Sequence, residues 1–348
     1  MKLVTKQVHL KRRPSGLPCP NDFEIAEVQL PELQYGQVLV RNLWMSVDPY
    51  MRRSMEEHAK DLEPWPIGGP LDGPAVGEVM ESRNTAFVPG DIVESMCGWQ
   101  QHFISDGDPF LPYLTSHNSI AKRTATDAHP RDYVGILGIA SMTAYAALVC
   151  LSSVQPGDTV VISSGAGTVG SVACQIAKIN GLRVVTSAGT DEKVRWLREE
   201  IGVDNAFNYR THSISAALAV ACPNGIDFVL ENASPEHLSA CLPLMNELKQ
   251  ILIAGFVSIY SNGGDISAFP NFEFVLDRYL TIRAFQFMEC LGSYDKFVAD
   301  MTKWRKEGLI KFRENHFDGL EQAPAAFCSL FSHDMSGKVL VNIGGDKA

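Results

Sequence analysis

The pattern of hydrophobic and polar positions changes near residue 133. Between residues 24 and 100, apolar or alternating runs are separated by Pro or Gly: EIAEVQL, GQVLVRNLWMSV, PAVGEVMES and DIVESMCG. Such punctuation predicts short strands joined by turns, as in a compact, partly open β-barrel. Residues 105–130 lack periodicity and are rich in Asp, Pro, Ser and His, so we expect loops around that barrel.

Beyond residue 133, strand-like runs alternate with helix-like segments. Strands are expected at TVVISS, LRVVTSAG, NAFNYR, IDFVLENA, QILIAGF and LTIRAFQF, and helices over 134–152, 169–180, 191–201, 213–222, 235–246 and 293–307. Repeated strand–helix steps predict an α/β fold with a parallel, doubly wound sheet. A helix around 320–332 and a last strand over 338–343 follow, and we expect that strand to return to the β-rich N-terminal domain.

A chain of 348 residues is long enough for two domains. We expect one domain over 1–130 and 311–348, which contains the barrel, and a second over 131–310, which contains the parallel sheet. The composition, with 45% hydrophobic and 20% charged residues, is that of an ordinary globular protein. The net charge of −10 argues against a nucleic-acid or anionic-membrane partner.

Targeting and metal signals are weak in this sequence. No apolar run reaches the length of a membrane span, and the first residues lack the apolar core of a signal peptide, so we expect a cytoplasmic protein. The eight cysteines include no C-x-x-C pair. This argues against a structural metal site and against a disulfide framework.

The most informative motif is TVVISSGAGTVG at residues 159–170, with glycines at Gly165, Gly167 and Gly170. A strand, a glycine turn and a helix in this order are typical of a dinucleotide site. Glycines let the backbone approach a pyrophosphate, which then accepts hydrogen bonds from N–H groups at the helix N-terminus. On the spacing alone, a tight turn without a ligand stays open.

The end of the second predicted strand, at Gly189, indicates which nicotinamide cofactor fits. An NAD site usually places Asp or Glu there to hold the ribose hydroxyls, but the strand ends without a carboxylate. Asp191 opens the next helix, where an acidic residue suits the helix dipole. Lys193, Tyr209 and Arg210 lie close to neighbouring strand ends and suit a 2′-phosphate, so NADPH is preferred, although Lys193 alone would also fit a solvated helix surface.

Several longer motifs resemble those of a known family over nearly the whole chain. They are SVDPYMR at 46–52, GTVG at 167–170, AGTDEK at 188–193, FNY at 207–209, GID at 225–227 and GFVSIY at 255–260. The chain is similar to the zinc-independent medium-chain dehydrogenase/reductases, and within them to the NADPH-dependent alkenal/one reductases, the group of prostaglandin and curcumin reductases. The resemblance implies a GroES-like barrel, the substrate and catalytic domain over 1–130 and 311–348, split around a Rossmann domain that binds NADPH over 131–310. It also implies a homodimer.

The resemblance also implies which residues bind NADPH. Gly167, Thr168, Val169 and Gly170 would contact the cofactor, Lys193 and Tyr209 would hold its 2′-phosphate, and Asn232 would lie near the nicotinamide ribose. Two segments would line the nicotinamide: Ala254, Gly255, Phe256, Val257, Ser258, Ile259 and Tyr260, and then Phe285, Gln286 and Phe287.

Four regions depart from related patterns. Zinc-containing relatives use a Cys early in the barrel and a His-Glu pair after a glycine, but this chain has Trp44-Met45-Ser46 and Leu71-Asp72-Gly73-Pro74 there, which supports a metal-free enzyme. The family's Asp-Asn-Val-Gly is Glu231-Asn232-Ala233-Ser234 here, and Met335 stands where an Asn is common. The last two departures put part of the cofactor affinity or substrate geometry in doubt.

The expected reaction is reduction of the carbon–carbon double bond of an α,β-unsaturated ketone or aldehyde, a small hydrophobic substrate. Without a metal, a neutral donor must stabilise the charge that develops on the carbonyl oxygen. Tyr260 is the first candidate and Tyr50 the second, and for both a purely structural role stays open. Met45, Met51, Met55, Trp65 and Trp99 could line a broad pocket or belong to the barrel core.

Other functions compete with this interpretation. A quinone reductase of the same superfamily would share the fold and NADPH. A non-catalytic NADPH-binding protein would fit the Ser234 and Met335 departures. An alcohol dehydrogenase fits least, because the metal ligands are missing.

Overall fold

The computed structural model describes residues 3–58, 63–109, 118–123, 128–262, 269–332 and 335–345, without the side chains of 260–262. The chain divides into two compact units. Unit 1 comprises Met1–Gly135 and Glu314–Ala348, and unit 2 comprises Ile136–Arg313. Within the described residues, no helix is long and apolar enough to cross a membrane.

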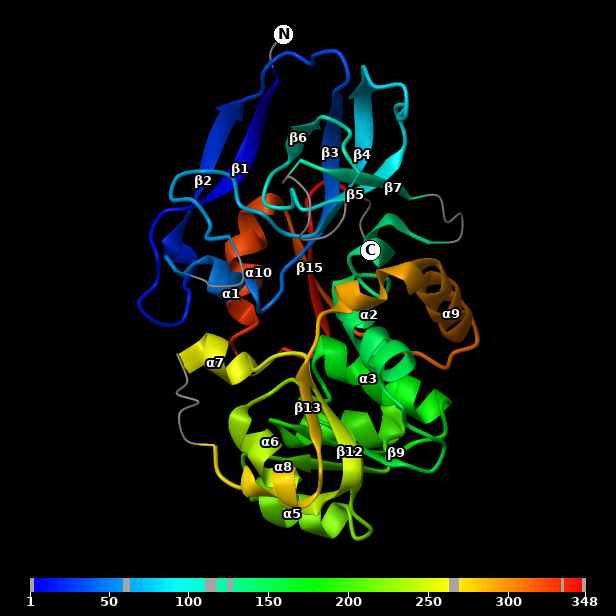
Figure 1. Ribbon diagram of the computed structural model, residues 1–348. Coiled ribbons are helices and arrows are strands. Elements are labelled where there is room, and N and C mark those ends of the chain that lie inside the picture. The colour runs from blue at the N-terminus through cyan, green and yellow to red at the C-terminus, as the bar shows by residue number, and fades with distance from the viewer. Residues whose placement is uncertain are drawn as a thin grey trace. The chain divides into compact units, whose positions relative to one another are not determined.

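Unit 1 is built on a mostly antiparallel sheet in the order β14-β15-β3-β4-β5-β7, with β6 also paired to β3 (Figure 1). A separate hairpin-like pair joins β1 and β2. The strands are β1 (Val4–Leu10), β2 (Phe23–Gln29), β3 (Val38–Ser46), β4 (Ala75–Ser82), β5 (Ile92–Ser95), β6 (His102–Ser105), β7 (Ile120–Arg123), β14 (Glu314–Asp318) and β15 (Lys338–Asn342). The helices are α1 (Met51–Ser54) and α10 (Ala323–Ser329), with short 3-10 turns at Pro20–Asp22, Pro130–Tyr133 and Leu320–Gln322.

In unit 1 the last strand confirms one expectation, and β7 corrects another. β15 pairs with β3, so the C-terminal strand does return to the N-terminal sheet. β7 lies in a region expected to be loop and pairs with β5. Its Lys122 and Arg123 form ion pairs with Asp91 and Glu94, which the apolar pattern could not reveal. β14, which pairs with β15, is also a polar strand without an apolar signature.

Unit 2 contains a parallel sheet in the order β10-β9-β8-β11-β12-β13. Its strands are β8 (Thr159–Ile162), β9 (Arg183–Ala188), β10 (Asn205–Asn208), β11 (Ile226–Glu231), β12 (Met245–Ile253) and β13 (Thr281–Ala284). Its helices are α2 (Ile139–Tyr145), α3 (Thr168–Ile179), α4 (Asp191–Trp196), α5 (Ile214–Ala221), α6 (Pro235–Cys241), α7 (Val257–Asn262), α8 (Glu273–Asp277) and α9 (Tyr294–Lys306). α3 packs with α2, and α5 packs with α6 on the other face of the sheet (Figure 1). This strand order is that of the Rossmann fold, so the expected fold class is confirmed.

Helix ends in unit 2 differ from the predicted ones for local reasons. The helix expected over 235–246 ends at Cys241, because Pro243 lacks the N–H that would continue it. β12 starts at Met245, inside the predicted helix. The helices expected over 134–152 and 191–201 each change to a π-helical turn, at Ala146–Leu151 and Leu197–Ile201.

Candidate functional site

The strand order of unit 2 places a candidate site at the carboxyl edge of its sheet. The chain adds β9 and β10 on one side of β8 and then crosses to add β11, β12 and β13 on the other. In open parallel sheets, ligands bind at the carboxyl ends of the strands beside such a reversal. The turns that follow β8, β9, β11 and β12 lie at this edge.

The turn after β8 uses glycine where a side chain has no room. A Cβ at Gly165 would lie 2.0 Å from the Thr186 hydroxyl oxygen, so this glycine packs the turn against β9. A Cβ at Gly170 would lie 2.2 Å from the carbonyl oxygen of Ser164. The two glycines therefore bring the turn and the start of α3 together, which other residues could not do without a backbone shift.

The N-terminus of α3 also lacks a side-chain cap. Its N-cap residue is Gly167, whereas hydroxyl groups of Thr190, Ser213 and Ser234 cap α4, α5 and α6. Backbone N–H groups at such a terminus can donate to an anionic ligand. The predicted pyrophosphate contacts, Gly167 to Gly170, form this first turn.

Tyr209 lies against the turn after β9, and Lys193 follows that turn in α4. Tyr209 directly follows β10, and its hydroxyl lies 3.0 Å from the position of a Cβ on Gly189. Lys193 lies in the first turn of α4, where its N–H donates to the Thr190 hydroxyl at 3.3 Å. The Asp191 carboxylate accepts a hydrogen bond from Asn208 at 2.7 Å, so it is engaged within the protein.

The turn after β11 is held by a buried polar network. The Ser163 hydroxyl, at the end of β8, donates to Oε1 of Glu231 at 2.8 Å and accepts the N–H of Asn232 at 2.7 Å. Oε2 of Glu231 lies 3.0 Å from Nδ1 of His237 on α6. The Asn232 side chain is buried and donates to the Ser163 carbonyl at 3.3 Å. These contacts join the turns at the ends of β8 and β11.

The segment expected to line the nicotinamide packs on that turn. The N–H of Val257 donates to the Asn232 carbonyl at 3.4 Å, and the N–H of Ser258 donates to the Ala233 carbonyl at 3.0 Å. Residues 254–256 follow β12, and Val257, Ser258, Ile259 and Tyr260 belong to α7, so Tyr260 lies in a helix. The Tyr260 side chain lies outside the described part of the structure.

The second nicotinamide segment follows the neighbouring strand. Phe285 comes directly after β13, and its N–H donates to the Ile253 carbonyl at 3.2 Å. Phe285 and Phe287 are buried, and Gln286 lies between them at the start of a 3-10 turn. The structure therefore brings this segment to the carboxyl end of β12.

In unit 1, the SVDPYMR motif is held by polar contacts within the unit. The Asp48 carboxylate contacts the Ser46 hydroxyl and the Lys338 ammonium, and Lys338 is buried. Arg52 donates to the Gly16 carbonyl at 3.1 Å. Tyr50 is half-buried and packs against the hydrophobic core of the unit.

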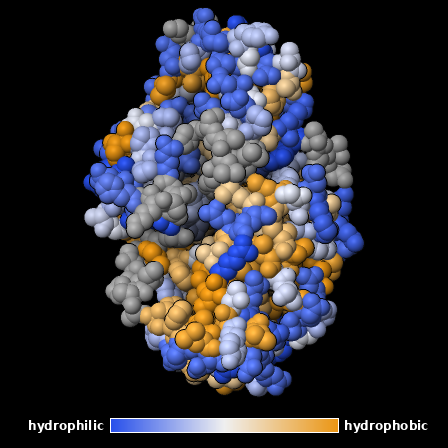
Figure 2. Space-filling model, in the orientation of Figure 1, coloured by the Kyte–Doolittle hydropathy of each residue, from blue (hydrophilic) through white to orange (hydrophobic). Residues whose placement is uncertain are grey.

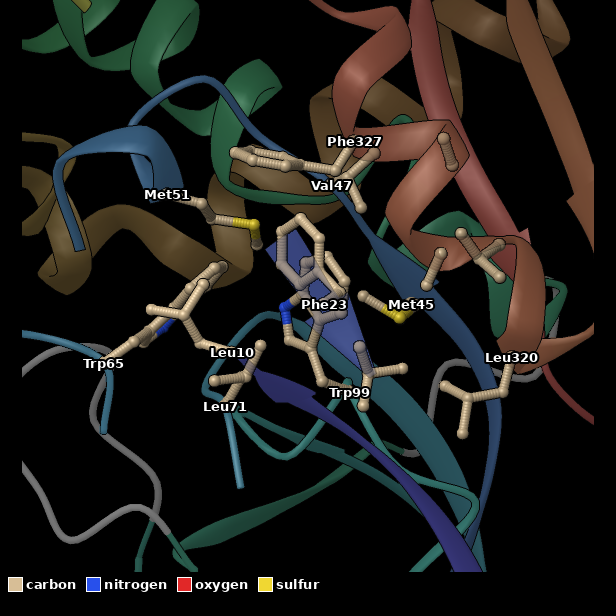
Figure 3. Close-up of a cluster of buried hydrophobic side chains, with 14 of the residues drawn as sticks. Leu10, Phe23, Met45, Val47, Met51, Trp65, Leu71, Trp99, Leu320 and Phe327 are labelled. Carbon is tan, nitrogen blue, oxygen red and sulfur yellow. The ribbon is translucent and has the colours of Figure 1, made fainter. Parts of the chain in front are cut away.

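The residues considered for a broad pocket are core residues. Met45, Met51, Met55, Trp65 and Trp99 are each at most 1% exposed. The Trp99 ring stacks on Phe23 at 5.6 Å and meets Trp65 edge-on at 5.4 Å (Figure 3). The pocket interpretation is therefore wrong for these five side chains, because they fill the space between β-strands and α10 instead of lining a cavity.

Two buried thiols are poor nucleophiles. Burial raises the pKa of the Cys97 and Cys174 thiols to about 12, so both stay protonated and poorly nucleophilic at neutral pH. Among the described residues, His, Cys, Asp and Glu form no group of three or more that could hold a metal ion.

Sequence reasoning missed the network of Ser163, Glu231 and His237. Glu231 entered only as a departure from the family pattern, and His237 did not enter at all. A carboxylate at the end of a buried apolar strand, with a histidine on the following helix, was the available signal.

Two family models match the chain. The N-terminal domain of oxidoreductase covers residues 6–112, and a model described as zinc-binding dehydrogenase covers residues 168–303.

Three similar proteins match nearly the full length. Prostaglandin reductase 1 of Bos taurus is 36% identical over 95% of this chain and 97% of its own. The NADPH-dependent curcumin reductase of Escherichia coli K12 is 34% identical over 97% of this chain and 96% of its own. The crystal structure of CurA from Vibrio vulnificus in complex with NADPH superposes with a TM-score of 0.88, at 30% identity over 99% of this chain and 100% of that one.

Proposed function

Because this chain belongs to the zinc-independent medium-chain dehydrogenase/reductases, in the group of prostaglandin and curcumin reductases, we propose that it reduces the carbon–carbon double bond of α,β-unsaturated ketones and aldehydes with NADPH. The observation that carries this proposal is the site itself: a glycine turn and an uncapped helix at the reversal of a Rossmann sheet, in a chain similar to NADPH-dependent reductases over its full length.

The residues present fit NADPH. A Cβ at Gly170 would lie against the Ser164 carbonyl, so glycine lets the turn pack on the start of α3, and the uncapped N–H groups there could donate to a pyrophosphate. β9 ends in Ala188 without a carboxylate that would repel a 2′-phosphate. Lys193, in the first turn of α4, and Tyr209, directly after β10, would supply a cation and a phenol for that phosphate.

The proposed mechanism assigns orientation and charge stabilisation to the protein. When bound, NADPH supplies the hydride that adds to the β-carbon of the enone. Residues 254–259 and 285–287 would hold the nicotinamide end beside the substrate. Tyr260 would donate a hydrogen bond to the carbonyl oxygen as negative charge develops there, before a proton is taken up at the α-carbon. Tyr50, in unit 1, is the second candidate for this donor or for a wall of the substrate pocket.

The test is an NADPH-consumption screen with a short 2-alkenal, an aryl enone, a diarylheptanoid enone and a benzoquinone. We expect turnover of at least one enone, with the saturated carbonyl compound as product by mass spectrometry. Turnover of the benzoquinone alone would identify a quinone reductase instead. Tight NADPH binding without oxidation by any acceptor would favour a non-catalytic binding protein.

We further propose that the protein forms a homodimer through unit 2. Among the described strands, β13 pairs only with β12, so its other edge is open for a strand of a second copy. Figure 2 shows a hydrophobic area on unit 2. The segment that leads into β13 exposes Phe272, Leu276 and Tyr279, and the exposed Leu248 is bonded to it through its N–H, which donates to the Arg278 carbonyl at 2.8 Å. Light scattering of the wild type and of Leu276→Glu tests this, and a monomeric wild type would contradict it.

A further inference from the structure

A buried hydrogen-bond network surrounds the Glu231 side chain at the end of β11. Oε1 of Glu231 accepts hydrogen bonds from the Ser163 hydroxyl at 2.8 Å and from the N–H groups of Ala233 and Ser234 at 2.6 and 2.9 Å. Oε2 of Glu231 lies 3.0 Å from Nδ1 of His237. Every one of these partners can supply a hydrogen, which suits a carboxylate, and both Glu231 and His237 are at most 2% exposed.

The network around Glu231 fixes the backbone of residues 231–234, and this backbone forms hydrogen bonds to residues 254–258. The Glu231 carbonyl accepts the N–H of Ala254 at 3.0 Å, and the Ala233 carbonyl accepts the N–H of Ser258 at 3.0 Å. The positions of residues 254–258 therefore depend on the turn at 231–234. That turn depends on the Glu231 side chain, because a hydrogen-bonded charged group fixes its partners more strongly than a neutral one does.

Burial of the His237 ring lowers the stability of the folded protein in one respect. Its Nε2 is buried and has no hydrogen-bond partner among the residues that the structure describes. A buried polar atom without a partner lowers stability, so packing alone does not explain an imidazole here. Its placement is specific: Ser234 caps α6 by accepting the His237 N–H at 3.1 Å, and this brings the ring to Glu231.

We infer that Glu231 and His237 are positioning residues for the nicotinamide end of NADPH. They fix the turns at 231–234 and 254–258 relative to the glycine turn, and they act through backbone contacts without touching the cofactor. This inference rests on the proposed function. Glu231 reaches both Ser163 and His237, and Ser234 caps the helix that carries His237.

The test compares two ligands of the full-length protein by calorimetry. NADPH occupies the whole proposed site, whereas 2′,5′-ADP occupies only the adenosine end, beside Lys193 and Tyr209. For Glu231→Gln we expect the dissociation constant of NADPH to rise about tenfold or more, since hydrogen bonds to a charged group are lost. The constant for 2′,5′-ADP should change less than about twofold.

His237 offers a paired test that does not remove the carboxylate. Asn places its amide nitrogen where Nδ1 of His lies, so His237→Asn should keep NADPH affinity close to the wild type. His237→Leu should weaken NADPH binding in the way Glu231→Gln does. If Glu231→Gln fails to fold, this pair alone decides the inference.

Asp227, at the other end of β11, provides the matched control. Its carboxylate also accepts several hydrogen bonds, from the Thr159 N–H and from Asn246, both at 2.9 Å. Asp227→Asn should lower the melting temperature without changing the ratio of the two dissociation constants.

Two outcomes overturn the inference. Equal weakening of both ligands in Glu231→Gln and His237→Leu would indicate a general structural role, and unchanged NADPH affinity in both would indicate no role. If the wild type binds neither ligand, the proposed function is wrong, and so is the inference that rests on it. If the wild type binds NADPH and the variants give either of the two outcomes above, only the inference is wrong.

Discussion

Two buried clusters, one in each unit, contrast in composition and in what they offer to function. The cluster in unit 1 joins aromatic rings and methionines such as Trp65, Trp99 and Met51, all fully buried. The cluster in unit 2 joins Ser163, Glu231 and His237 by hydrogen bonds at the ends of two strands. An apolar cluster stabilises a fold through area and close packing. A buried polar cluster contributes less net stability but defines one geometry, which is what a binding turn needs.

The largest expected effect is on the stability of the apolar cluster. Trp99→Ala removes a ring that contacts Phe23, Trp65 and Phe327. The free energy of unfolding should fall by about 3–5 kcal/mol, because the cavity left behind cannot fully collapse. Denaturant unfolding followed by tryptophan fluorescence measures this loss. The folded fraction should bind NADPH normally, and a parallel loss of affinity would break the distinction between the two clusters.

The second effect is on chemistry. Tyr260→Phe removes the proposed donor to the developing enolate oxygen, so kcat should fall by roughly two to three decades, equivalent to about 3–4 kcal/mol. NADPH affinity should stay close to that of the wild type. Steady-state kinetics with an enone together with calorimetry test this. Unchanged turnover with normal binding would refute the oxyanion role and make Tyr50→Phe the next variant to examine.

The third effect is on the glycine turn. Gly170→Ala places a methyl group against the backbone carbonyl of Ser164, so the turn or α3 must shift. Such overpacking typically costs about 1–3 kcal/mol, and NADPH affinity should fall about tenfold or more. Gly292→Ala is the control, because a Cβ there meets nothing within 4 Å. Equal affinity in both variants would mean that the turn does not bind the pyrophosphate.

The fourth effect is on cofactor choice. Lys193→Ala should raise the dissociation constant of NADPH about tenfold and leave that of NADH nearly unchanged, because only NADPH carries the 2′-phosphate. Tyr209→Phe should shift the same ratio by a smaller amount. The ratio of the two dissociation constants is the measurement, and a parallel change for both cofactors would argue against a phosphate contact.

The contrast between the clusters also separates what could be predicted from what could not. The parallel sheet was predictable, because apolar strands such as β8 and β11 alternate with helices at regular intervals. The glycine turn was predictable, because strand, glycines and helix are contiguous in sequence. β7 and the side-chain network were not, since Arg123 and Glu94, like Ser163 and Glu231, are far apart in sequence and meet only when the sheets form. The aromatic residues were ambiguous because a core and a pocket use the same side chains.

The smallest expected effect concerns Asp227, whose carboxylate lies at the opposite end of β11 from that of Glu231. Burial opposes ionisation of Asp227, but hydrogen bonds from Asn246 and the Thr159 N–H, with the Lys249 charge, outweigh it and lower the pKa of this carboxyl below 3.8. A lowered pKa stabilises the folded state above pH 3.8, and the contribution is lost as the pH falls through the lowered value.

Asp227→Asn should therefore be less stable than the wild type by no more than about 1 kcal/mol at pH 6. The difference should shrink as the pH falls below 3.8. Because Asp227 lies at the amino end of β11, away from the binding turns, NADPH affinity should not follow this change. A constant stability difference across the pH range, or a loss of affinity, would show that the two ends of the strand do not divide stability and binding in this way.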